Sequence, residues 1–291
     1  MRPAWVIALF LSFGVTLAQA NAPATEPAVG RVEAKFQESD PNGGVANVLK
    51  RIGWKLPSDA PERNYDLAQE SFIIYLPADY APEKKFGLLA FISPSDNGEP
   101  PEQFLPVLDK HHLIWVAANK VGNKRPVWSR IGITLDGIHN MRSRYTLDEN
   151  RIYVSGVSGG GRVASFMGVC FADVCQGGLY IIGTDFYRQL STGRKANEFW
   201  PKAYEVPPTR ILASAKKRGR HVMLNGADDQ NRFQSEAIAR QMKREGFSSV
   251  TYLEAPGVGH RLPGEEWLGK AISKLDESAR NATTRSAPRQ P

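Results

Sequence analysis

The chain has 291 residues, of which 42% are hydrophobic and 23% charged, and its formal net charge is +7. Its lysines and arginines are scattered, and the densest basic run, residues 216–220, is interpreted as a solvated helix end rather than a nucleic-acid surface. The only cysteines, Cys170 and Cys175, are too few for a disulfide framework or a zinc site. We therefore expect no nucleic-acid partner, no metal and no cofactor.

Residues 1–20 have the pattern of a secretory signal peptide. Arg2 precedes an apolar run of about 13 residues, and Ala18-Gln19-Ala20 forms a cleavage signal. The run is shorter than the roughly 20 residues of a membrane-spanning helix, and no second long apolar run follows. The sequence thus predicts a secreted or periplasmic protein that is not inserted in the membrane after signal cleavage.

After an N-terminal extension expected to be partly irregular, residues 21–66, short apolar runs alternate with helical patterns. The predicted strands are 71–76, 87–92, 113–118, 151–157, 178–182, 221–224 and 250–253. The predicted helices are 101–110, 131–145, 161–171, 208–217, 234–245 and 265–280. This alternation predicts an α/β fold with a doubly wound, mostly parallel sheet.

The core domain is expected to be a single unit spanning residues 67–280, because α/β folds of this size commonly form one domain. Residues 183–207 form a connection longer than a compact α/β unit needs, and we interpret them as a lid-like insertion. The polar tail, residues 281–291, is expected to be disordered. Nothing in the sequence indicates an oligomeric state.

A candidate nucleophile follows the strand predicted at 151–157. Ser158 stands in a G-x-S-x-G pattern between a strand and a helix, the setting of a nucleophile elbow. Gly156 and Gly160 supply the small neighbours that the sharp turn requires, whereas Ser155 has Tyr153 two residues before it. Ser158 then needs a base and a carboxylate, because a serine hydroxyl is a poor nucleophile at neutral pH.

His260 is the candidate base, because it alone among five histidines lies in a glycine-rich loop between a strand and the last helix. Asp228 and Asp229 follow the strand predicted at 221–224, and either could orient the imidazole. The order serine, acid, histidine is that of α/β-hydrolases.

The oxyanion formed by attack on a carbonyl needs backbone N–H donors. Gly159, directly after the nucleophile, is expected to supply one. The second is expected from Ser93 or Ser95 in the loop after the strand predicted at 87–92, since Pro94 has no N–H group.

Substrate contacts are predicted from aromatic residues in two loops. Phe186, Tyr187 and Trp200 in the lid-like insertion could form a pocket wall above the serine or simply cover the sheet edge. Trp128, after the strand predicted at 113–118, could line the same pocket or pack in the core.

Two side-chain pairings are also predicted. In an oxidising compartment, Cys170 and Cys175 could close a small disulfide loop, with two buried thiols as the alternative. Arg162, near the start of a helix, is unfavourable to the helix dipole and is therefore expected to pair with a carboxylate.

With these residues in view, the stretch 71–275 resembles secreted α/β-hydrolases of the type grouped with polyhydroxybutyrate depolymerases and feruloyl esterases. The matching segments are 92–95, 113–119, 151–162, 226–232 and 256–260. The resemblance implies an α/β-hydrolase fold and a serine esterase acting on small or polymeric esters. It also favours Asp229 over Asp228, because it places the acid about three residues after Gly226.

We therefore expect an exported serine hydrolase, a carboxylesterase that uses a Ser-His-Asp acyl-enzyme mechanism. A peptidase or a polyester depolymerase would use the same three residues. A non-catalytic exported binding protein on a hydrolase scaffold is the alternative from another class.

Overall fold

A computed structural model describes residues 29–286 of the chain, with side chains described for residues 29–277. The predicted signal peptide lies outside the described residues. Within them, no helix has the length and apolar character needed to cross a membrane.

The predicted strands form one eight-stranded sheet in the order β1-β2-β4-β3-β5-β6-β9-β10. Its strands are β1 (Gly30–Ala34), β2 (Phe72–Leu76), β3 (Phe86–Ile92), β4 (Leu113–Ala118), β5 (Leu147–Val157), β6 (Gly177–Ile181), β9 (Arg220–Gly226) and β10 (Ser249–Ala255). Only the pairings of β2, with β1 and with β4, are antiparallel. The predicted mostly parallel sheet is confirmed.

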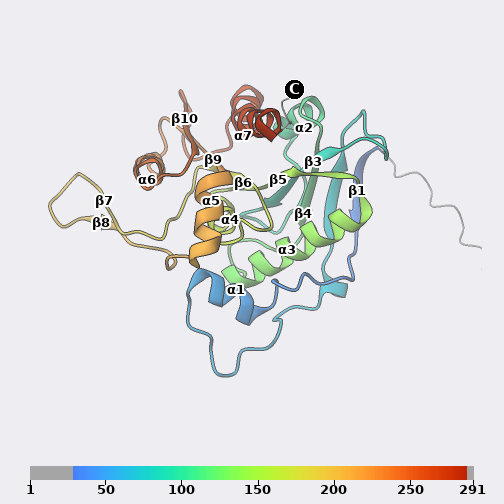
Figure 1. Cartoon of the computed structure of the whole chain (residues 1–291), viewed down its shortest axis with the longest axis horizontal. Helices are drawn as coiled ribbons and strands as arrows, with labels where there is room; N and C mark the ends of the chain where they lie inside the picture. The colour runs from blue at the N-terminus through green and yellow to red at the C-terminus, as the bar shows by residue number, and fades with distance from the viewer. Residues whose placement is uncertain (1–28, 287–291) are drawn as a thin grey trace, which may run out of the picture.

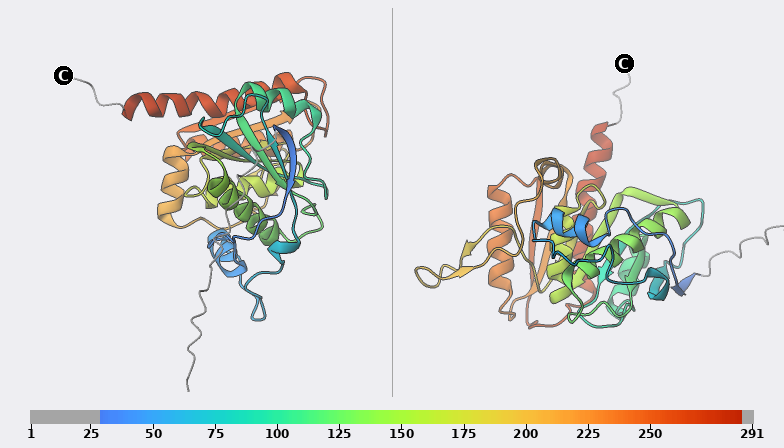
Figure 2. Two further views of the ribbon diagram at one scale, coloured as in Figure 1. Left: turned by 90° about the vertical axis from the view of Figure 1, so that its right-hand side faces the viewer. Right: turned by 90° about the horizontal axis from the view of Figure 1, so that it is seen from below.

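Helices cover both faces of the sheet, as the two views in Figure 2 show. One face is packed by α2 (Leu105–Lys110) and α7 (Glu265–Ser286), the other by α3 (Val127–Arg144), α4 (Gly159–Cys170), α5 (Thr209–Arg218) and α6 (Arg232–Arg244). Successive strand residues point to opposite faces, so Leu88 and Ala90 of β3 enter one buried cluster, and Leu89 and Phe91 the other. Burial on both faces explains why the strands are continuously apolar.

Three segments differ from the sequence-based expectation. The N-terminal extension contains β1, which adds to the sheet edge, and α1 (Val45–Ile52), which packs beneath α3 and α4 (Figure 1). The insertion 183–207 carries a two-stranded hairpin, β7 (Leu190–Ser191) and β8 (Phe199–Trp200), that projects from the body of the molecule (Figure 1). Residues 281–286, predicted as part of a disordered tail, continue α7, because neither glycine nor proline follows Gly269 before Pro288.

Candidate active site

Ser158 lies at the turn between β5 and α4, in a strained backbone conformation with φ of 54° and ψ of −118°. Few residues other than glycine adopt a positive φ, and such strain is concentrated at functional sites. The turn closes because Gly156 and Gly160 lack a Cβ. A Cβ on Gly156 would lie 2.7 Å from the Ile92 carbonyl oxygen, and one on Gly160 would collide with the same oxygen. The chain therefore holds the Ser158 hydroxyl in a sharp elbow above the sheet.

The structure brings Ser158, His260 and Asp229 into one hydrogen-bonded series. Ser158 Oγ lies 2.9 Å from Nε2 of His260, and Nδ1 of His260 lies 3.2 Å from each carboxylate oxygen of Asp229. His260 comes from the loop after β10, and Asp229 from the loop between β9 and α6. Of the two aspartates left open by the sequence, Asp229 is buried and contacts the histidine, whereas Asp228 is exposed.

Asn231, which no sequence pattern singled out, holds the Asp229 end of this series in place. Its backbone N–H donates to Asp229 Oδ1 at 3.0 Å, and its side-chain amide donates to the Ile182 carbonyl at 3.0 Å. The same Nδ2 lies 3.5 Å from Nδ1 of His260. Asn231 therefore contacts both partners: its backbone N–H orients the Asp229 carboxylate, and its side chain lies beside the imidazole nitrogen that faces this carboxylate.

The loops on the other side of Ser158 contain the expected oxyanion donors. Gly159 begins α4, and its N–H group makes no backbone hydrogen bond within the described residues. The Ser95 N–H donates to the hydroxyl of Ser93 at 3.2 Å, a long hydrogen bond. Asn123 donates its own N–H to the Pro94 carbonyl at 3.0 Å, and its carboxamide lies against Gly159, where a Cβ would come within 2.9 Å of Nδ2.

Beneath these loops lies Arg130, a buried arginine that sequence reasoning missed. Its side chain donates to the Ser93 carbonyl at 2.9 Å and makes a longer contact, 3.5 Å, with the Gly159 carbonyl. Nε has no partner, and no carboxylate among the described residues lies within 4.0 Å of the guanidinium. Burial lowers the pKa of Arg130 to about 10. Its position in the chain, in the first turn of α3, gave no sign of these contacts.

The aromatic residues predicted to contact substrate occupy different environments. Phe186 and Tyr187 are each only 2% exposed, so their predicted substrate-binding role is wrong. The first part of the insertion folds back into the core, where Phe186 packs on Phe247 and the Tyr187 hydroxyl donates to Glu245. Trp128 and Trp200 are half-buried, and their substrate contacts stay a prediction.

The predicted disulfide is wrong in this structure, because Cys170 and Cys175 are both buried free thiols. The thiol of Cys175 faces backbone carbonyls of α4, at 3.5 Å from Phe171 and 3.7 Å from Met167. Burial raises the pKa of both thiols, that of Cys175 to about 12. The predicted pairing of Arg162 is confirmed, since its guanidinium lies 2.5 Å from the Asp185 carboxylate.

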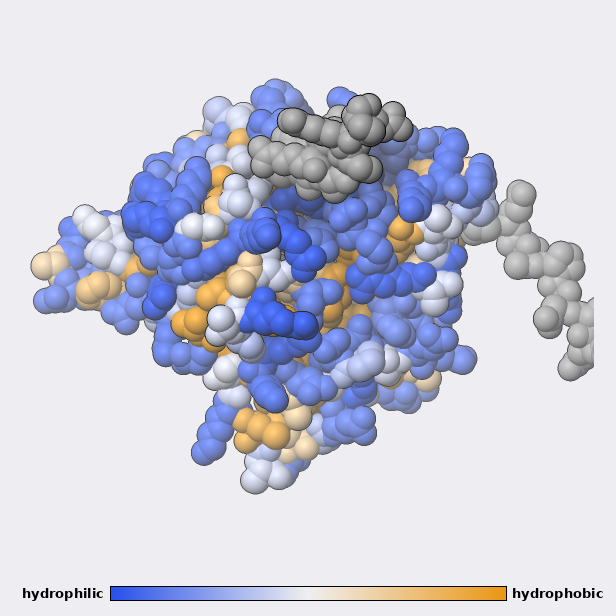
Figure 3. Space-filling model, viewed as in Figure 1, coloured by the Kyte–Doolittle hydropathy of each residue, from blue (hydrophilic) through white to orange (hydrophobic). Residues whose placement is uncertain are grey.

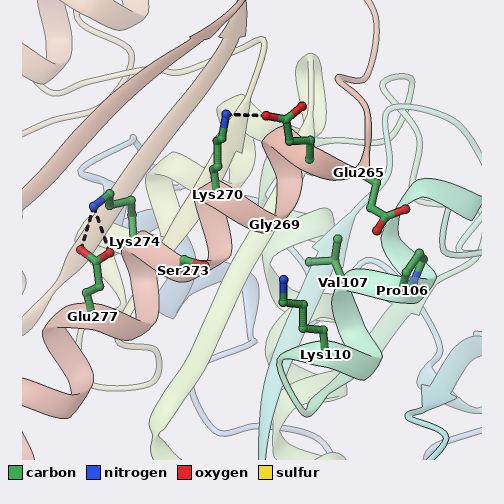
Figure 4. A pocket seen from close by; sticks show the side chains of 10 residues that line it. Pro106, Val107, Lys110, Glu265, Gly269, Lys270, Ser273, Lys274 and Glu277 are labelled. Carbon is green, nitrogen blue, oxygen red and sulfur yellow. Dashed lines mark hydrogen bonds and ion pairs between the residues drawn. The ribbon is translucent and has the colours of Figure 1, made fainter.

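A hollow of the described surface lies away from Ser158 and is lined mainly by charged side chains. Figure 4 shows this hollow between α2 and α7, lined mainly by lysines and glutamates that pair with one another, such as Lys270 with Glu266 and Lys274 with Glu277. On the face seen in Figure 3, hydrophilic residues predominate and hydrophobic ones gather in small areas. In the described part of the chain, no group of three or more histidine, cysteine or acidic residues is placed to hold a metal ion.

The chain resembles known proteins in structure rather than in sequence. No family model and no curated protein matches the chain. Among solved structures, one described as FAE has a TM-score of 0.53 at 16% identity, covering 92% of this chain and 96% of its own. S-formylglutathione hydrolase (FrmB) from Staphylococcus aureus gives 0.52 at 14%, covering 72% and 92%. Esterase 2 from Thermogutta terrifontis gives 0.50 at 17%, covering 78% and 94%.

Together with the strand order, these similarities show that the chain has the α/β-hydrolase fold. The fold expected from the sequence is thus confirmed. At identities of 14–17% the likeness establishes the fold, and the chemistry must be argued from the site itself.

Proposed function

We propose that this protein is an exported serine hydrolase, and more narrowly a carboxylesterase. The observation that carries the proposal is the hydrogen-bonded series from Ser158 through His260 to the buried Asp229, with the serine in a strained elbow. A nucleophile, a base and an orienting acid in this geometry form the arrangement used for acyl transfer.

The proposed reaction begins with attack of Ser158 Oγ on the ester carbonyl. His260 takes the serine proton at Nε2 and returns it to the leaving alcohol, while Asp229 holds Nδ1–H and stabilises the imidazolium. Water then attacks the acyl-enzyme by the same route, and the acid product leaves. Both steps pass through a tetrahedral oxyanion.

We assign the oxyanion donors to the N–H groups of Gly159 and Ser95. Gly159 lies at the N-terminus of α4, where the helix dipole favours negative charge. Ser95 is exposed, and its long bond to the Ser93 hydroxyl can be exchanged for a stronger, charge-assisted bond to the oxyanion.

An ester substrate is favoured over a peptide because the solved structures of the same fold described above include an esterase and an S-formylglutathione hydrolase. Peptidase or polyester depolymerase activity on the same three residues is the nearest alternative. A binding protein without activity is disfavoured by the complete serine, histidine and aspartate series. Export is proposed from the signal-peptide pattern of residues 1–20.

The test is the Ser158→Ala variant, with Ser155→Ala as the matched control. Ser155 is buried nearby, and its hydroxyl donates to the Leu179 carbonyl, away from the histidine. We expect Ser158→Ala to lower the hydrolysis of p-nitrophenyl acyl esters by about 10⁴-fold or more at an unchanged melting temperature. It should also lose labelling by a fluorophosphonate probe.

Ser155→Ala should keep both the activity and the labelling. Unchanged hydrolysis by Ser158→Ala would disprove the assignment. A wild-type protein that the probe does not label would instead indicate a binding protein. A panel of short acyl esters, feruloyl esters and peptides identifies the substrate class, and cleavage of the peptides alone would make the protein a peptidase.

A further inference from the structure

Arg130 stands in a place where a cation is doubly unfavourable. It is 3% exposed and has no carboxylate partner in the described structure, so its charge is desolvated without compensation. It also lies in the first turn of α3, near the positive end of the helix dipole. Replacing such an arginine with an apolar residue of similar size is commonly neutral or stabilising. Stability alone therefore does not explain Arg130.

The contacts of Arg130 converge on the two sides of the proposed oxyanion hole. One guanidinium nitrogen donates to the carbonyl of Ser93, which begins the loop containing Ser95. Another lies 3.5 Å from the carbonyl of Gly159, which follows the nucleophile. A rigid, planar guanidinium can hold two such carbonyls at a fixed separation.

We propose that Arg130 is a positioning residue for the oxyanion hole. It fixes the Ser93 loop against the start of α4, so that the N–H groups of Ser95 and Gly159 converge on one point. Its uncompensated positive charge beneath that point stabilises the negative charge that develops on the substrate oxygen, in a buried setting that requires no reorganisation during the reaction. This inference rests on the proposed hydrolase function.

The test compares Arg130→Met and Arg130→Lys with Arg151→Met as a matched control. Arg151 is a partly buried arginine, but unlike Arg130 it is paired with a carboxylate, that of Asp276 in α7, at 2.9 Å. The kinetics are measured with a p-nitrophenyl ester, and the melting temperature of each variant is recorded. Binding of an aryl boronic acid, which forms a tetrahedral anionic adduct with the serine, reports oxyanion stabilisation directly.

We expect Arg130→Met to lower kcat about 10- to 100-fold and to weaken boronate inhibition by a similar factor, since one oxyanion contact contributes on this order or more. KM should change less than about threefold, and the melting temperature should stay the same or rise. Arg130→Lys keeps the charge but can reach only one carbonyl, so its kcat should lie between those of Arg130→Met and the wild type. Arg151→Met should show the opposite pattern, with a lower melting temperature and wild-type kcat.

Wild-type kcat and boronate inhibition in both Arg130 variants would overturn the inference. If Arg130→Met does not fold, Arg130→Lys decides: a reduced kcat with parallel weakening of the boronate supports the proposal, and wild-type values refute it. Loss of kcat with unchanged boronate inhibition also refutes it. A wild-type protein inert toward ester, peptide and fluorophosphonate is a different result, the failure of the proposed function itself.

Discussion

Two groups of polar residues, one at each end of the sheet strands, differ in whether their side chains are paired. At the carboxyl ends of the strands, Ser158 holds a strained positive φ, His260 is half-exposed, and Arg130 is buried without a carboxylate. The backbone of Ser158 and the unpaired charge of Arg130 are locally unfavourable, and all three residues belong to the proposed site.

At the amino ends, Arg151, Tyr153 and Asp276 form a mutually hydrogen-bonded cluster. Arg151 donates two hydrogen bonds to the buried Asp276 of α7, and the Tyr153 hydroxyl donates a third at 3.0 Å. Arg151 also donates to the His111 carbonyl at 2.6 Å. The Arg151–Asp276 cluster therefore supports the fold, and the residues at the carboxyl ends are the ones to which we assign function. Such a division is expected where activity requires locally unfavourable geometry.

Among changes at the proposed site that leave Ser158 in place, Asp229→Asn is expected to have the largest effect. The amide cannot stabilise the imidazolium and favours the wrong histidine tautomer, so kcat/KM should fall by about 10³- to 10⁴-fold. Asp228→Asn is the control, because the adjacent carboxylate is exposed and makes no contact with His260. Steady-state hydrolysis of a p-nitrophenyl ester measures both. Equal losses in the two variants would contradict the assignment of Asp229.

Removing the Arg151–Asp276 ion pair should lower stability and leave activity unchanged. Arg151→Met leaves Asp276 buried without its main cation, and the free energy of unfolding should fall by about 3–5 kcal/mol. Urea denaturation measures the loss, and kcat determined at a temperature where the variant stays folded should match the wild type. A reduced kcat with unchanged stability would mean that the amino-end network contributes to catalysis.

The same network predicts how stability depends on acid. Burial alone would raise the pKa of Asp276, but hydrogen bonds from His111 and Arg151 outweigh it and lower the pKa from 3.8 to about 2. The folded protein binds this proton less readily than the unfolded chain. The stabilisation, about 2 kcal/mol, is therefore present above pH 3.8 and is lost as the pH falls through 2.

Urea denaturation across this pH range should show that loss in the wild type. The Asp276→Asn variant, which has no carboxyl group to titrate there, should show a flatter dependence. Parallel curves for the two proteins would contradict the assignment.

The fold and the Ser158–His260 pair were predictable because their signals are local. Apolar runs gave the strands of the parallel sheet, and Ser158 and His260 were selected by their neighbours in the chain. Arg130 and Asn231 could not be selected in this way. Their roles come from contacts with carbonyl groups of Ser93 and Ile182 that are distant in sequence, and no spacing rule encodes them.

The errors have the same origin. Phe186 and Tyr187 were assigned to a lid because they are aromatic residues in a long insertion. Whether such residues fold outward or into the core depends on the space beside α6. There Phe186 packs on Phe247, and the Tyr187 hydroxyl donates to Glu245. Likewise, the five-residue spacing of the cysteines allowed a disulfide, but in the structure the Cys175 thiol lies 3.5 Å from the Phe171 carbonyl and both thiols are free.

The smallest expected effect is in the reactivity of Cys170 and Cys175, which should contrast with the reactivity of Ser158. Cys170 ends α4 and Cys175 precedes β6, whereas Ser158 lies directly before the other end of α4. Thiolates are the reactive form of cysteine, and burial raises the pKa of both groups. A disulfide reagent such as DTNB should therefore leave the native protein unmodified under conditions where a fluorophosphonate labels Ser158. After unfolding in guanidinium, two thiols per chain should react. No reaction even after unfolding would show that the protein carries the disulfide that this structure lacks.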